Sequence, residues 1–105
     1  MNRVYRDWDE VVEKRLTDNP DEARLYLLEA MQEYFNDNNL STFLVALRHV
    51  VNSQGGIGLI AERSGLDRRH LYRVLSDNGN PHFSTIITVL RALNIKVDRL
   101  GELRV

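Results

Sequence analysis

The 105-residue sequence predicts an all-α fold, a bundle of short helices that contains a helix-turn-helix and carries an N-terminal helical extension. Two observations lead to this prediction. Apolar residues recur at helical spacing in several segments, which are separated by polar capping residues or glycines. In addition, residues 57–76 (IGLIAERSGLDRRHLYRVLS) have the pattern of two short helices joined by a tight turn.

The N-terminal extension is predicted to hold two helices. The first lies within residues 3–16, with Trp8 expected in the core and a partner-binding surface as the alternative. The second begins at Pro20, because proline is favoured in a first turn, and runs to about residue 36. Glu29 and Glu33 are expected on solvated surface. The inward stripe of the second helix comprises Ala23, Leu27, Ala30, Met31 and Tyr34, broadened by Leu28 and Phe35.

A third helix is predicted from Ser41, as its N-cap, to about Ser53. The Gly55–Gly58 segment that follows resembles a phosphate-binding loop only in its glycines. It lacks the P-loop lysine and follows a helix rather than a strand, so we interpret it as a flexible turn.

The helix-turn-helix prediction depends on small and apolar residues at fixed positions. Two helices that cross steeply need a small residue at the crossing, which Ala61 provides. The turn needs left-handed backbone, which is least costly for glycine, and Gly65 stands there. Asp67 is a good N-cap for the second helix. The apolar residues expected to clamp the two helices together are Ile60, Leu66, Leu71 and Val74.

The second of these helices leaves Arg68, Arg69, Tyr72 and Arg73 pointing outward. Such a helix fits the major groove of DNA, where arginine forms two hydrogen bonds with guanine. His70 is a candidate phosphate contact. The alternative is a solvated basic face of an ordinary bundle. The joint pattern of small, apolar and basic positions favours DNA binding.

After a turn at residues 77–81, Ser84 is predicted to cap a helix over residues 85–93. Asn94 can take the left-handed position that ends it. Residues 95–99 fit either a short strand or a last helical turn, and the alternation of Ile95, Lys96 and Val97 favours a strand. Such an edge could pair with a second subunit.

Composition favours one cytoplasmic domain with an acidic and a basic part. No apolar run approaches the roughly 20 residues that span a bilayer, the N-terminus lacks a signal peptide's apolar core, and there is no cysteine. Residues 1–39 hold 5 basic and 10 acidic residues, a net charge of −5, whereas residues 40–105 hold 9 and 5, a net charge of +4. We expect a helical extension over 1–39, packed on the same core, and a DNA-binding domain over 40–105. This asymmetry suits one face for DNA and another for a second partner.

Catalytic and metal-binding patterns are absent from the sequence. His49, His70 and His82 are the only histidines, and no pair has the spacing of a helical metal site. His49 is expected on a helix surface. No nucleophile or carboxylate pair stands in a recognisable context. We therefore expect a protein that is not an enzyme and needs no cofactor or metal.

Residues 57–97 resemble the lambda-repressor-like helix-turn-helix domain, with Ala61 and Gly65 at its small positions. The longer run from VALR at 45–48 through GGIGLIAERSGLDRRHLYRVLSDNGNPHFSTIITVLRALNI is similar to addiction-module antidote proteins of the HigA type. The family pattern is matched by LYR at 71–73, LS at 75–76, GNP at 79–81, Thr85, and AL at 92–93. YRDW and YLLEAMQE, near the N-terminus, extend the resemblance over nearly the whole chain.

The resemblance implies a bacterial antitoxin that binds a small RelE/ParE-like toxin and represses its own operon as a homodimer. It places Arg68, Arg69 and Arg73 where such domains read bases. Asp67 departs from the usual Ser or Thr and adds a negative charge near phosphates, and Asn94 replaces a common glycine. Two alternatives remain: a stand-alone helix-turn-helix regulator, and a protein-interaction module of the same fold without DNA binding, which the net charge of −1 favours.

Overall fold

The computed structural model describes residues 3–76 and 79–95, with side chains described from residue 7 onward. Within these ranges every regular element is a helix, which confirms the all-α class. The predicted strand at 95–99 lies, apart from Ile95, outside the described residues. The helices are α1 (Arg3–Asp18), α2 (Pro20–Asp37), α3 (Leu40–Ser53), α4 (Ile57–Ser64), α5 (Arg68–Val74) and α6 (Phe83–Ala92).

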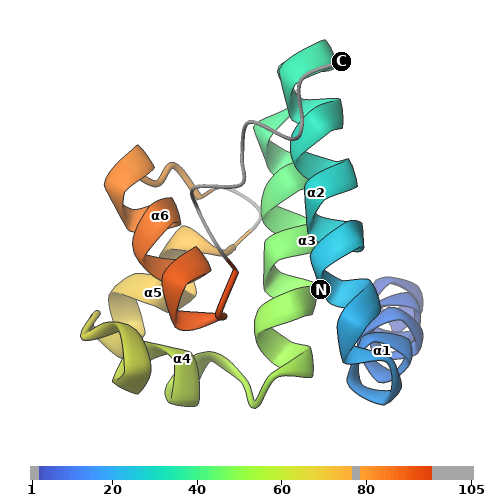
Figure 1. Ribbon diagram of the computed structural model, residues 1–105, viewed down its shortest axis with the longest axis horizontal. Helices are drawn as coiled ribbons and strands as arrows, with labels where there is room; N and C mark the ends of the chain where they lie inside the picture. The colour runs from blue at the N-terminus through green and yellow to red at the C-terminus, as the bar shows by residue number, and fades with distance from the viewer. Residues whose placement is uncertain (1–2, 77–78, 96–105) are drawn as a thin grey trace.

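α3 is the central helix (Figure 1). It packs against α1 and α2 on one side and contacts α4, which in turn packs against α5 and α6. Helices α1–α3 form an N-terminal group and α4–α6 a C-terminal group, and residues of both groups belong to one hydrophobic core. Because neighbours surround α3, it is buried around most of its circumference. Its buried residues are Phe43, Leu44, Ala46, Leu47, His49, Val50 and Val51.

Two predicted helix starts are wrong, each by two residues. α3 begins at Leu40, because the side chain of Asn39 is the cap and accepts a hydrogen bond from the Thr42 N–H at 3.2 Å. Ser41 therefore lies inside α3. α6 likewise begins at Phe83, so Ser84 lies in its first turn. Several capping residues precede α3, and the backbone path selects Asn39 among them. The N-cap of α6 is His82, whose side chain makes no capping hydrogen bond.

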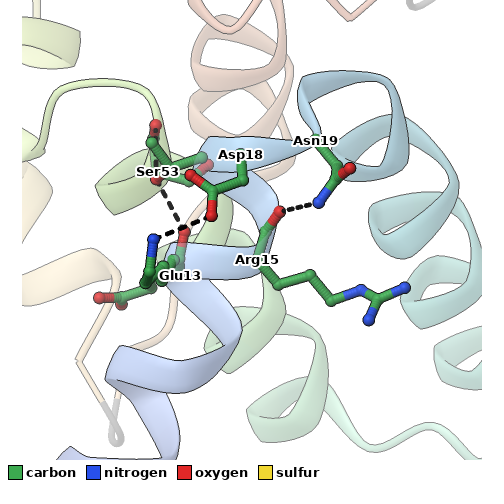
Figure 2. Close-up of polar contacts among 7 residues, drawn as sticks. Glu13, Arg15, Asp18, Asn19 and Ser53 are labelled. Atoms are coloured by element: carbon green, nitrogen blue, oxygen red, sulfur yellow. Dashed lines mark hydrogen bonds and ion pairs between the residues drawn. The ribbon is translucent and has the colours of Figure 1, made fainter.

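The C-terminal part of α1 is hydrogen-bonded to the end of α3 (Figure 2). Thr17 Oγ1 lies 3.4 Å from the Ser53 carbonyl oxygen, and the Asn52 side chain donates to Glu13 Oε2 at 2.8 Å. Leu16, on the same turn of α1, is buried. This end of α1 is thus held by both polar and apolar interactions.

The start of α1 is much less covered. Trp8 is 62% exposed, and so is Val11 on the next turn. The prediction that Trp8 is a core residue is therefore wrong. Helical spacing identifies an apolar stripe on α1, but it does not show how far along the stripe the neighbouring helices reach.

Arg48 joins the two groups of helices. Its Nη1 donates a hydrogen bond to the carbonyl oxygen of Leu75, the residue that ends α5, at 2.9 Å. The last carbonyls of a helix have no partner within the helix and carry a partial negative charge, so a guanidinium there is favourable. This contact fixes the end of α5 relative to the central helix.

Candidate nucleic-acid interface

α4 and α5 are joined by a tight turn whose residues the sequence predicted. Gly65 ends α4 with left-handed backbone (φ 78°) and donates its N–H to the Ala61 carbonyl oxygen at 2.9 Å. Asp67 then caps α5, because its Oδ2 accepts the His70 N–H at 3.0 Å. Both ends of the turn are thus set by local chemistry.

Buried apolar side chains hold α5 on its neighbours. Ile60 and Ala61 on α4 are at most 5% exposed, and Leu71 on α5 is completely buried. Val74 is also buried, whereas Leu66 in the turn is partly buried and packs against the core. The apolar positions predicted to clamp the two helices together therefore face inward, Leu66 only in part, whereas Gly65 in the turn is exposed. The opposite side of α5 is therefore fixed toward solvent.

That outward side of α5 carries the predicted contact residues. Arg68, Arg69, Tyr72 and Arg73 are exposed, and Tyr72 has 66% of its surface accessible. Arg68 also lies across α4, since its guanidinium carbon is 3.6 Å from where a Cβ on Gly58 would stand. His70 is only half-exposed, so it is less available than the arginines.

This surface presents planar guanidinium groups and one phenol on a rigid, short helix. Guanidinium groups bind phosphates and the edge of guanine, and a tyrosine hydroxyl adds a donor to phosphate. Among the described residues, no group of three or more His, Asp or Glu side chains could hold a metal ion. The exposed face of α5 is therefore chemically suited to contact with an anion.

A second polar feature, in the N-terminal group, was not predicted. His49 on α3 is 1% exposed, which corrects its expected surface position. Its Nε2 lies 2.5 Å from Asp9 Oδ1 on α1, and its Nδ1 lies 2.6 Å from the Tyr26 hydroxyl on α2. One ring thus connects three helices. The signal in the sequence was that α3 is apolar on more than one face, which marks a helix surrounded by others.

The Tyr26 hydroxyl sits in an environment that opposes its ionisation. Burial raises the pKa of Tyr26, and the negative charges of Asp9 and Glu13 raise it further. The phenol therefore stays protonated and can donate to His49 Nδ1. His49 Nε2–H can then donate to the Asp9 carboxylate, so that both ring nitrogens are satisfied.

Comparison with known proteins identifies the family. Residues 13–100 match the family described as probable addiction module antidote protein. The chain belongs to this family. It is also 35% identical over 96 residues to an uncharacterized protein of Haemophilus influenzae (strain Rd), an alignment that covers 91% of each chain. No solved structure matches the chain.

Membership in the antidote family gives the chain an antitoxin role in a toxin–antitoxin system and implies a cognate toxin partner. Such antidotes are regulatory rather than enzymatic. The matched region extends from the middle of α1 past α6, so it includes both groups of helices. In residues 3–76 and 79–95, no helix combines the length and apolar character needed to cross a membrane.

Proposed function

We propose that this chain is a sequence-specific DNA-binding antitoxin of the HigA type. In this proposal α4 and α5 form a lambda-repressor-like helix-turn-helix, and α5 enters the major groove of an operator. Arg68, Arg69 and Arg73 read bases, Tyr72 and His70 contact the backbone, and the protein represses its own toxin–antitoxin operon. The acidic N-terminal extension, residues 1–39, neutralises a small RelE/ParE-like toxin.

One observation carries the DNA-binding proposal: α5 is buried on one side through Leu71 and Val74 and presents exposed arginines on the other. A recognition helix needs this combination, because only a helix held rigidly can aim side chains at base edges. Each good arginine–guanine pair contributes roughly 1–3 kcal/mol of discrimination against the wrong base.

A homodimer would place two copies of α5 in successive major grooves, about 34–36 Å apart, on a near-palindromic operator. In this arrangement Asp67 lowers the affinity for DNA, because the carboxylate that caps α5 lies close to the negatively charged phosphates. Its benefit is the hydrogen bond to the His70 N–H. We expect the attraction of the three arginines to DNA to outweigh the repulsion by the Asp67 carboxylate, because three cations share the surface with one anion.

The test is a titration of the protein into a fluorescent duplex from the region upstream of its own gene, with a random duplex alongside, at two salt concentrations. The test variant is Arg68→Ala/Arg69→Ala. The matched control is Lys14→Ala/Arg15→Ala, which also removes two adjacent cations but from the exposed surface of α1, where they make only surface ion pairs.

We expect tight binding to the upstream duplex, at least tenfold weaker binding in the α5 variant, and little change in the control. Equal and weak binding to both duplexes would show that the α5 arginines are only a solvated face. The protein would then be an interaction module of this fold. Specific binding without a toxin encoded nearby would instead indicate a stand-alone regulator.

A further inference from the structure

A cleft opens between the helices of the N-terminal group. It has a volume of about 290 Å³, and its walls come from α1, α2 and α3 alone. This volume is roughly ten times the ~30 Å³ that one water molecule takes up in the liquid, so the cleft can accept a whole side chain. It is separate from the α5 surface.

The rim of the cleft combines an aromatic ring with two carboxylates. Trp8 on α1 lines one side and is 62% exposed. Glu29 and Glu33, one turn apart on α2, also line the cleft, and both are exposed. In the described part of the chain, the ion pairs involve neither glutamate. Two like charges at this spacing repel each other, and a cation between them would remove the repulsion.

Small apolar side chains form much of the cleft's lining. Ala30, Val45 and Ala46 contribute small apolar surface, and His49 lies at the bottom with both ring nitrogens occupied by Asp9 and Tyr26. Thr42 also lines the cleft and adds one hydroxyl group. Most of the remaining lining suits contact with a hydrocarbon stem. A ligand with an aliphatic stem and a cationic head fits both floor and rim.

Arginine fits this cleft better than lysine. A guanidinium stacks flat on an indole ring and can pair with carboxylates through two parallel hydrogen bonds, whereas an ammonium is more strongly hydrated. We propose that the cleft receives an arginine side chain of the toxin, with its guanidinium against Trp8 and between Glu29 and Glu33. This inference rests on the proposed function, since it takes the partner to be the toxin.

The experiment measures binding of the toxin encoded by the neighbouring reading frame to the full chain. The test variant is Glu29→Gln/Glu33→Gln. The matched control is Glu10→Gln/Glu62→Gln, which removes the same charge from two exposed positions that do not line the cleft. Far-UV circular dichroism checks that each variant is folded.

A second readout needs no substitution. Trp8 is the chain's single tryptophan, so labelling with 5-fluorotryptophan gives one ¹⁹F resonance that reports on the rim of the cleft. Unlabelled toxin adds no signal. The resonance should shift when the toxin binds to the wild-type chain.

We expect the test variant to bind toxin at least tenfold more weakly and the control to stay within about twofold of wild type. The proposal that the cleft receives an arginine is overturned if all three proteins bind the toxin with equal affinity. It is also overturned if the Trp8 resonance does not move in the complex. In both cases the antitoxin role stands. A wild-type chain that does not bind the toxin overturns both.

Discussion

The two groups of helices use polar side chains in opposite ways. In the N-terminal group a histidine, an aspartate and a tyrosine turn inward and join α1, α2 and α3 through His49. In the C-terminal group the interior of α4 and α5 is apolar, and the charged residues of α5 face solvent. Residue type alone therefore does not indicate role. A polar residue surrounded by helices is structural, and one on a free helix face is available to a partner.

This comparison gives a direct prediction for the histidines. His49→Ala should lower the free energy of unfolding by about 3 kcal/mol, because it removes two hydrogen bonds, leaves the Asp9 carboxylate without its partner and opens a cavity. Urea denaturation at neutral pH measures the change. His82→Ala, at an exposed position, is the matched control and should cost less than about 0.5 kcal/mol. Similar losses in both variants would contradict a structural role for His49.

The glycines of the C-terminal group give a prediction of intermediate size. A Cβ on Gly79 would stand 2.0 Å from the Val74 carbonyl oxygen, at the end of α5, so Gly79→Ala must displace backbone. We expect a loss of about 1–3 kcal/mol in the free energy of unfolding. DNA affinity should also fall, because the end of α5 shifts.

Gly58→Ala is the control for that experiment. The three atoms nearest to a Cβ at this position belong to the Arg68 side chain, at ordinary contact distances from 3.6 Å, and Gly58 lies within α4. Alanine is the better helix former, so stability should stay unchanged or rise by up to about 1 kcal/mol. If Gly58→Ala destabilises as much as Gly79→Ala, close packing at Gly79 is not the cause.

Local chemistry in the sequence was sufficient to predict most of the fold. Proline at the start of α2, glycine at the end of α4 and aspartate before α5 each act on neighbouring backbone, and the structure has Pro20, Gly65 and Asp67 in those places. The outward position of the α5 arginines could be predicted as well, because the face opposite the buried side of a short helix must point toward solvent.

What the sequence did not reveal depends on contacts between distant segments. The periodic pattern around Trp8 is the same whether or not another helix covers it, and the wrong prediction for Trp8 has this cause. His49 was misplaced because its partners, Asp9 and Tyr26, are 40 and 23 residues away. The cleft beside them requires the packing of three helices and has no local signature.

The smallest predicted effect is a change in pH dependence at Tyr26. Because burial and nearby acidic groups raise its pKa in the folded state, the unfolded chain loses the phenolic proton first as pH rises. The contribution to stability is thus complete below about pH 10, the ordinary value for tyrosine, and is lost as pH rises through the folded-state pKa.

Tyr26→Phe should lower stability by about 1 kcal/mol at neutral pH, through the lost hydrogen bond, yet flatten the decline above pH 10. Urea denaturation from pH 8 to 11 measures both effects, with Tyr72→Phe, on the exposed face of α5, as the matched control. Parallel declines of wild type and Tyr26→Phe would mean that the Tyr26 phenol ionises equally easily in both states, and that the inward polar network of α1–α3 is as open to water as the surface of α5.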